Sequence, residues 1–354
     1  MLETSARQRA AWDAGTLPPV ERVAGGLWSI PVPLPDTPLR YVLVYAIELG
    51  DGVALVDAGW DTEEAWAALA DGLATLGGSI ADVRGVAVTH IHPDHYGLAG
   101  RLADPPGEAS DAWIGLHPAD AALLEGRYVA PEGLVASMAD LLEVCGVPAA
   151  IVPDLAGSSM QVRAFVRMAP PDRLIEDGDA LELRGWDLRA VWTPGHSPGH
   201  LCFHSESRRL LLAGDHVLPR ISPNISVHAQ QPVNPLADYL ASLGAVEHLA
   251  CDEVLPGHEW RFTGLAERVE ALRAHHARRL DEVCTALQEG PLTCWELTTR
   301  LTWSRPLETT SAFIQRAASG ETLAHLVLLE GEGAVVRDPG RPARFSLAEG
   351  RGPC

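Results

Sequence analysis

The chain has 354 residues, of which 47% are hydrophobic, enough for one large core and a second, smaller domain. Its formal net charge is −20 and its sequence contains no lysine, which excludes a catalytic lysine, a Schiff base and a lysine-dependent phosphate loop. The acidic body is also a poor platform for a nucleic-acid backbone, which needs clustered positive charge.

The first fifteen residues are polar and lack the apolar core of a secretory signal. No apolar run approaches the length needed to span a bilayer. We therefore expect a cytoplasmic protein with no membrane partner. The six cysteines are scattered without a C-x-x-C pair, so the sequence predicts neither a disulfide framework nor a zinc ribbon.

The first half of the chain predicts strands and helices in alternation. Residues 26–57 are predicted to be strands, because their apolar runs are separated by turn residues such as the G-D-G at 50–52. Residues 61–76 place apolar side chains at helical spacing behind an acidic first turn. An apolar strand at 83–90 then leads into a histidine cluster, and the same order of elements returns at 112–124.

From residue 185 the pattern changes to short apolar strands joined by Gly, Pro or Ser turns. A helix is predicted over 236–249, a strand ending in a loop over 252–260, and a long helix over 264–288. Strand groups interleaved with helices predict an α/β fold in which two sheets pack face to face under helices on both sides.

The segment 290–354 predicts two or three short helices and then two strands around a Gly/Pro turn, an order typical of a winged helix. We expect a main domain over 1–264 with a helical insertion at about 127–170, and a smaller winged-helix-like domain over 265–354. The insertion holds three of the four methionines, which suit either a lid over a partly apolar substrate or packing onto the body.

Three imidazoles and one carboxylate gather at His90, His92, Asp94 and His95, directly after an apolar strand. A loop at the end of a strand can point alternate side chains to one side. His90 and His92 can then share one metal, while Asp94 and His95 turn toward a second. Such ligands suit Zn²⁺, and also Fe or Mn. The alternative is a solvated histidine-rich turn.

Three further candidates occur in similar settings downstream. His196, Asp215 and His258 each follow an apolar strand and abut Gly or Pro, so the backbone can bring several strand ends to one rim. Four repeats of this arrangement indicate one joint metal site far more strongly than any single motif does.

In order and context, these motifs resemble the metallo-β-lactamase superfamily over roughly residues 20–262. The resemblance implies an αββα sandwich with a dinuclear site, most simply two zinc ions per chain, at one edge of the two sheets. It assigns His90, His92 and His196 to the first metal, Asp94, His95 and His258 to the second, and Asp215 to both. Asp57 would orient a ligand histidine through a hydrogen bond.

The implied activity is hydrolysis by a hydroxide that bridges the metals and attacks a small acyl substrate, such as a thioester, lactone or ester. Asp94 is the candidate catalytic residue, as a proton carrier to the leaving group. The polar loop after Asp215 offers four candidate substrate-binding residues: His216, Arg220, Asn224 and His228. Of these, Arg220 could hold a substrate carboxylate.

Other functions remain open at this point. The C-terminal segment resembles the winged-helix tail of the β-lactamase-like protein 2 group, some members of which are ribonucleases, so a metal-dependent ribonuclease or phosphodiesterase is the alternative. Against a nucleic-acid partner stand the acidic body and the composition of residues 265–354, which hold 11 Arg against 12 acidic residues. The tail would instead pack on the body, shape the site or form a homodimer. A ligand-sensing regulator and an iron-dependent oxidative enzyme are further alternatives.

Overall fold

The computed structural model describes residues 2–107, 110–230 and 233–348. The chain forms two compact units, each built from three segments. Unit 1 comprises Met1–Leu124, Val162–Pro223 and Ser242–Val269. Unit 2 comprises Glu125–Gln161, Asn224–Ala241 and Glu270–Cys354. The insertion expected at about 127–170 thus falls mainly in unit 2, together with the C-terminal region. The predicted boundary between two domains after residue 264 stays a prediction.

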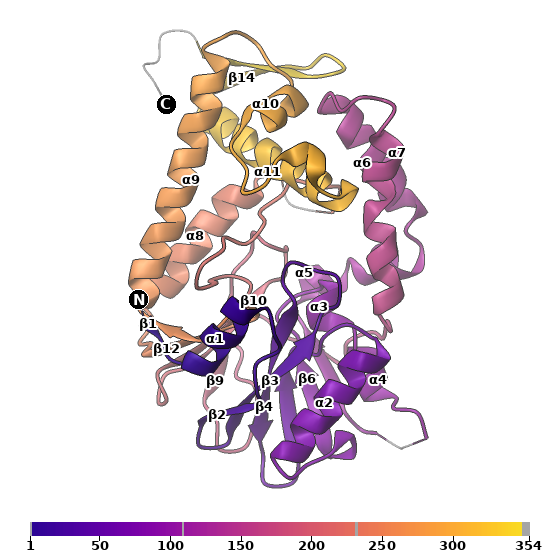
Figure 1. The fold of residues 1–354 in the computed structure, drawn as a ribbon, viewed down its shortest axis with the longest axis vertical. Helices are drawn as coiled ribbons and strands as arrows, with labels where there is room; N and C mark the ends of the chain where they lie inside the picture. Colours follow the sequence, from indigo (N-terminus) through magenta and orange to yellow (C-terminus); the bar gives the residue numbers. More distant parts are fainter. Residues whose placement is uncertain (1, 108–109, 231–232, 349–354) are drawn as a thin grey trace. The chain divides into compact units, whose positions relative to one another are not determined.

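A seven-stranded sheet in unit 1 has the order β2-β3-β4-β5-β6-β7-β8 (Figure 1). Pairing is antiparallel from β2 to β5 and parallel from β5 to β8. The strands are β2 (Glu21–Ala24), β3 (Leu27–Pro33), β4 (Tyr41–Glu48), β5 (Val53–Val56), β6 (Val83–Ala87), β7 (Trp113–Leu116) and β8 (Arg173–Leu174).

A six-stranded sheet in the same unit has the order β1-β13-β12-β11-β10-β9. Its pairs are antiparallel except for β11 with β12. The strands are β1 (Leu2–Glu3), β9 (Leu188–Trp192), β10 (Leu201–Ser205), β11 (Leu210–Gly214), β12 (Glu253–Pro256) and β13 (Phe262–Thr263). The sequence predicted strands in all these regions except β1, β2, β8 and β13.

Strand β4 is an inner strand of the seven-stranded sheet and is buried along seven of its eight residues. Its tyrosines reach the other sheet: the Tyr41 hydroxyl donates to the carbonyl of residue 259 at 2.7 Å, and the Tyr45 hydroxyl to the carbonyl of Pro256 at 2.9 Å. A buried hydroxyl needs such an acceptor, so these bonds fix how the strands meet.

The helices of unit 1 follow the predicted alternation. They are α1 (Ala6–Ala14), α2 (Glu63–Thr75), η1 (Ile80–Asp82), α3 (Pro93–Tyr96), α4 (Ala99–Ala103) and α5 (Pro118–Ala121). Helix α2 begins where the Thr62 hydroxyl accepts from the Ala65 amide. It packs on β3 at Gly72, where a β-carbon would lie 2.3 Å from Ile30 Cγ2. The sequence did not predict α1.

Unit 2 is mainly helical, with one two-stranded sheet. Its elements are η2 (Glu125–Val129), α6 (Glu132–Val144), α7 (Val152–Gly157), α10 (Cys294–Arg300), η4 (Leu307–Thr309), α11 (Ala312–Gly331), β14 (Val335–Asp338) and β15 (Arg344–Leu347). Three helices have residues in both units: η3 (Ser158–Phe165), α8 (Pro235–Glu247) and α9 (Leu265–Leu287). Helices α8 and α9 confirm the predictions at 236–249 and 264–288.

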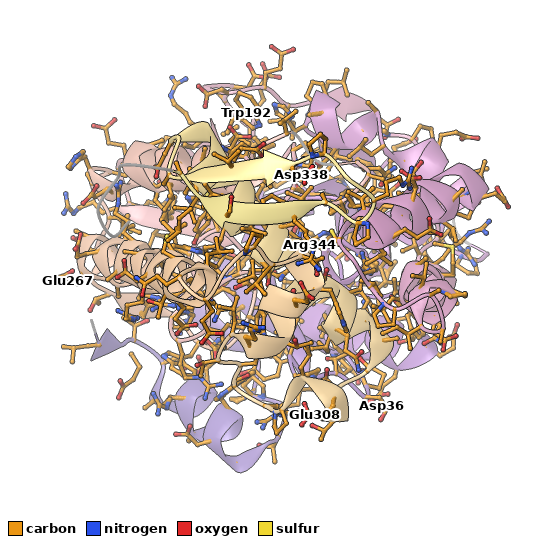
Figure 2. All side chains as sticks on the ribbon, turned by 90° about the horizontal axis from the view of Figure 1, so that it is seen from above. Asp36, Trp192, Glu267, Glu308, Asp338 and Arg344 are labelled. Atoms are coloured by element: carbon orange, nitrogen blue, oxygen red, sulfur yellow. The ribbon has the colours of Figure 1, made fainter. Side chains whose placement is uncertain are left out.

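One apolar core joins the segments of unit 2. Met138 and Leu142 of α6 share it with Val283, Leu326 and Phe345 from the C-terminal segment. The strands β14 and β15 form an antiparallel hairpin whose ends carry Asp338 and Arg344, which face each other in register (Figure 2). A C-terminal helical region followed by a hairpin is therefore present, while its classification as a winged helix stays a prediction.

Candidate metal centre

The histidine cluster begins three residues after β6 ends. His90 is fully buried, and its Nε2 lies 3.0 Å from Nδ1 of His92. These two rings and the ring of His196 bring one nitrogen each to within 4.8 Å of one another. Because β6 and β9 end at the same rim, segments about 100 residues apart in the sequence supply this first triad.

A second triad forms from Asp94, His95 and His258. Pro93 starts the short helix α3 and so places Asp94 and His95 in its first turn. Oδ2 of Asp94 lies 3.3 Å from Nε2 of His258, which follows β12. The two triads share no residue.

Asp215 lies between the triads at the end of β11. Its Oδ2 is 3.5 Å from Nε2 of His196, in the first triad. Its Oδ1 is 3.4 Å from Nε2 of both His95 and His258, in the second. One carboxylate therefore presents an oxygen to each group of ligands.

The donor atoms fit metal cations. Nε2 of His95, Oδ1 of Asp215 and Nε2 of His258 are buried and form no hydrogen bond with any described residue. Buried polar atoms are almost always satisfied, so such convergent, unsatisfied nitrogen and oxygen atoms fit a binding site for cations. Gly257 keeps this space open, because a β-carbon there would lie 2.7 Å from Cε1 of His95 and 2.8 Å from Oδ1 of Asp215.

The electrostatics of the centre also favour positive charge. Burial alone would lower the pKa of His95, but the carboxylates of Asp57 and Asp215 outweigh burial and raise that pKa well above its ordinary value. The pKa of His258 is raised to about 10 in the same way: burial lowers it, and Asp215 and Asp94 raise it by more. Metal cations can supply this positive charge in place of protons.

Asp57 sits just beyond the ligand set. Its Oδ2 is 2.7 Å from Nδ1 of His95, while its Oδ1 accepts a hydrogen bond of 2.8 Å from the Thr89 amide. Because Nδ1 of His95 is hydrogen-bonded to Asp57, its Nε2 is directed toward the other ligand atoms of the metal centre. This is the geometry expected of the residue that the sequence placed behind a ligand histidine.

Sequence reasoning missed Asp120, which ties two ligand segments together. Its fully buried carboxylate accepts hydrogen bonds from the Ile91 amide at 2.8 Å, the Ser197 hydroxyl at 2.8 Å and the Gly199 amide at 2.7 Å. The available signal was its position in an H-P-x-D sequence after the apolar strand β7, the same setting that marked the ligands. His200 was also missed; its Nε2 accepts from the Asp215 amide at 3.2 Å.

The four candidate substrate-binding residues are divided between the two units. His216 is fully buried in unit 1 beside His200. Arg220, also in unit 1, donates from Nε to the buried carboxylate of Glu259 at 3.0 Å, so part of its donor capacity is engaged within the protein. Asn224 and His228 belong to unit 2, where Asn224 donates to Glu321 at 3.2 Å.

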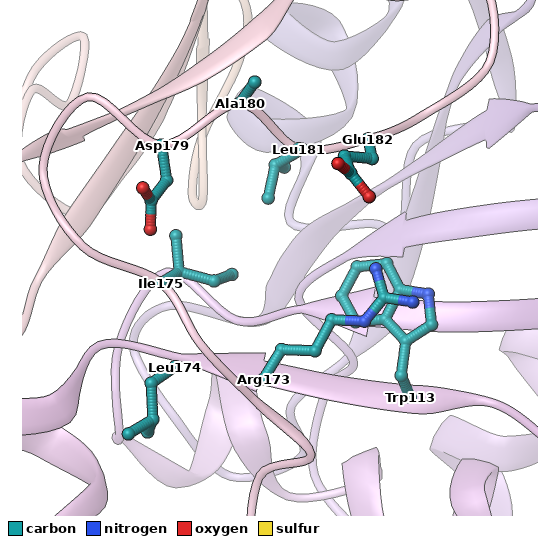
Figure 3. A pocket seen from close by; sticks show the side chains of 8 residues that line it. All are labelled: Trp113, Arg173, Leu174, Ile175, Asp179, Ala180, Leu181 and Glu182. Atoms are coloured by element: carbon teal, nitrogen blue, oxygen red, sulfur yellow. The ribbon is translucent and has the colours of Figure 1, made fainter.

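A pocket in unit 1 lies between β8 and the segment that leads to β9 (Figure 3). The guanidinium carbon of Arg173 lies 4.3 Å from the ring centroid of Trp113 at its side. The pocket is lined by Trp113, Arg173, Leu174, Ile175, Asp179, Ala180, Leu181 and Glu182. None of the predicted site residues is among them.

This fold and ligand arrangement define a class of metal-dependent hydrolases. Residues 37–258 match the model of the metallo-β-lactamase superfamily, and the chain belongs to that superfamily. Members bind metal ions, and the His/Asp clusters described above could hold them.

Three relatives show how far the similarity extends. The chain is 36% identical to a metallo-β-lactamase family protein of Thermus thermophilus, with a TM-score of 0.79 over 92% of this chain and all of that one. It is 28% identical to the probable metallo-hydrolase YqjP of Bacillus subtilis, over 87% of this chain and 93% of that protein. An atrochrysone carboxyl ACP thioesterase of Aspergillus fumigatus is 26% identical over 72% of this chain but only 46% of its own length. The chain is thus a hydrolase of this superfamily, as predicted.

No helix in the described part of the chain is long and apolar enough to cross a bilayer.

Proposed function

We propose that the chain is a dinuclear metal hydrolase that cleaves small acyl substrates, thioesters first. The observation that carries the proposal is the position of Asp215, whose two oxygens face two separate triads of ligands. His90, His92 and His196 would hold one ion, Asp94, His95 and His258 the other, and Asp215 would contact both. Zinc is the metal that best suits these nitrogen and oxygen donors.

Two ions bound here would lower the pKa of a shared water and so supply hydroxide near neutral pH. The residues of the chain orient the ligands and exclude bulk water. Asp57 holds His95 through Nδ1, and the carboxylate of Asp120 fixes the backbone on both sides of the first triad. These hydrogen bonds would hold the ligand atoms in position for the ions.

Asp94 is the residue that we propose to move a proton. Its side chain is 16% exposed, whereas those of His95 and His258 are fully buried. A carboxylate that reaches both the centre and the substrate side can carry a proton to the leaving group.

A nucleophilic cysteine is not needed, and the cysteine nearest in sequence to the site is unsuited to that role. Cys202 is fully buried on β10, and burial raises the pKa of its thiol to about 12. Since thiolate is the reactive form, this cysteine is inert near neutral pH.

The preference for thioesters rests on the named activity of the fungal relative, together with the acidity of this chain. A net charge of −20 disfavours binding along an RNA backbone and does not hinder a small acyl substrate. A homodimer and a cytoplasmic location are part of the same proposal.

The test combines metal analysis with a panel of thioester, ester, lactone and RNA substrates. We expect about two zinc equivalents per chain and chelator-sensitive turnover of an acyl substrate. His92→Ala should lose metal and turnover together. His248→Ala is the matched control, because His248 is exposed and lies outside the centre. RNA cleavage with no acyl turnover would overturn the substrate class, and one metal equivalent at full activity would overturn the dinuclear centre.

A further inference from the structure

Unit 2 contains an arginine whose charge is not neutralised by any described carboxylate. Arg316 lies on the first turns of α11, a helix that packs against α7. Among the described residues, its guanidinium donates a hydrogen bond only to the Ser158 hydroxyl, from Nε at 3.2 Å. No carboxylate among the described residues forms an ion pair with its guanidinium.

The Ser158 contact orients the guanidinium. The hydroxyl of Ser158 is buried and donates to the Leu155 carbonyl at 2.7 Å, so its lone pair is turned toward Arg316. Because Nε is hydrogen-bonded to Ser158, the two terminal nitrogens of the guanidinium form its opposite edge, which we call the fork. Neither donates a hydrogen bond to a described residue. This edge is the one that binds planar or tetrahedral oxyanions with two parallel hydrogen bonds.

A second positive charge lies nearby. Arg127, on η2, forms no ion pair with the described residues, and burial together with its like charge lowers the pKa of Arg316 to about 10. Burial and mutual repulsion of two guanidiniums both cost free energy. The side chain of Arg316 nevertheless stays partly exposed. The guanidinium of Arg316 is thus strongly desolvated, while the residue keeps some contact with solvent.

The neighbouring side chain is apolar. The ring of Phe313 lies 5.1 Å from the guanidinium carbon of Arg316 and is 41% exposed. It offers a hydrophobic contact directly beside the charged fork. An organic anion would contact both the guanidinium of Arg316 and the ring of Phe313, whereas an inorganic ion would contact only the guanidinium.

We propose that Arg316 and Arg127, with the Ser158 hydroxyl as orienting group, form a binding site for the phosphate group of a small organic phosphate. Two guanidinium charges match the dianion of a phosphate monoester better than the single charge of a carboxylate. The site lies wholly within unit 2 and does not depend on the metal centre. It goes beyond the proposed hydrolase activity.

The experiment measures binding by isothermal titration calorimetry with phenyl phosphate, inorganic phosphate and benzoate as probes. Metal ions also bind phosphate, so the titrations use both the metal-loaded protein and His92→Ala, whose metal centre is broken. Phenyl phosphate should bind both proteins with similar affinity and more tightly than the other two probes. Binding that disappears in His92→Ala would assign the phosphate to the metal centre and overturn the proposal.

Arg316→Met removes the fork and keeps most of the side-chain length. We expect it to weaken phenyl phosphate binding at least about tenfold, the loss of one charge-assisted pair of hydrogen bonds. Arg127→Met should weaken it in the same direction, and it serves as the second test if Arg316→Met fails to fold. Arg305→Met is the matched control, because Arg305 is exposed elsewhere in unit 2. Equal affinity in Arg127→Met and the wild type would overturn the site, as would equal affinity in a folded Arg316→Met.

Discussion

Replacing Asp120 by asparagine tests whether one buried carboxylate positions the first triad. An amide of the same shape keeps one acceptor oxygen and replaces the other with an NH₂ donor. In the present structure one carboxylate oxygen accepts from Ile91 and Ser197, and the other accepts from Gly199. Either orientation of the amide therefore points a donor at a backbone N–H. The Ser197 hydroxyl can rotate to accept, but an amide N–H cannot.

The expected cost follows from these three bonds. Loss of one buried bond to a charged acceptor costs about 1.5–3 kcal/mol, and the two remaining bonds weaken because their acceptor is now neutral. We expect a loss of about 3 kcal/mol in the free energy of unfolding. Because the affected amides flank His90 and His196, metal affinity should fall roughly 10- to 100-fold.

Urea unfolding measures the first quantity, and competition with a chromogenic chelator measures the second. Asp111→Asn provides the matched control, since Asp111 is exposed and precedes the same strand, β7. If Asp120→Asn bound zinc as tightly as Asp111→Asn and unfolded at the same urea concentration, the carboxylate would have no positioning role.

Three further outcomes are expected. Gly257→Ala should lose zinc, because its β-carbon would lie within 2.8 Å of Asp215 Oδ1; Gly157→Ala, with open space around it, should keep its zinc in the same metal analysis. Chelation should lower the Tm of the wild type, since an ion at 1,000 times its Kd stabilises the folded state by about 4 kcal/mol, and calorimetry should show a much smaller shift in His92→Ala. Iodoacetamide at pH 8 should leave Cys202 unmodified, because a thiol with a pKa of about 12 is protonated there; rapid labelling of the native protein, read by mass spectrometry, would contradict this.

The sequence was most informative where a polar residue directly follows an apolar strand. That local pattern located His90, Asp215 and His258, and the structure brings them together because the strands end at one rim. Asp120 escaped notice because its role depends on donors 29, 77 and 79 residues away in the sequence. The H-P-x-D sequence after β7 marks the position of Asp120, but it does not reveal these long-range donors.

Helix α1 was missed for an equally physical reason. It has little apolar periodicity: of its nine residues only Gln8 and Trp12 are buried. Asn224 and His228 were predicted to bind substrate because they follow Asp215 in the sequence. They belong to unit 2, and their role in substrate binding stays a prediction.

The discontinuous composition of unit 2 has a consequence for synthesis of the chain. Helix α6 is made early, yet its apolar residues Met138 and Leu142 are buried by partners such as Leu326 and Phe345 near the other end of the sequence. Until the residues around Leu326 and Phe345 have left the ribosome, this face of α6 has no native cover. Unit 2 therefore cannot complete its folding before that point, and until then the emerging chain carries an aggregation-prone apolar surface.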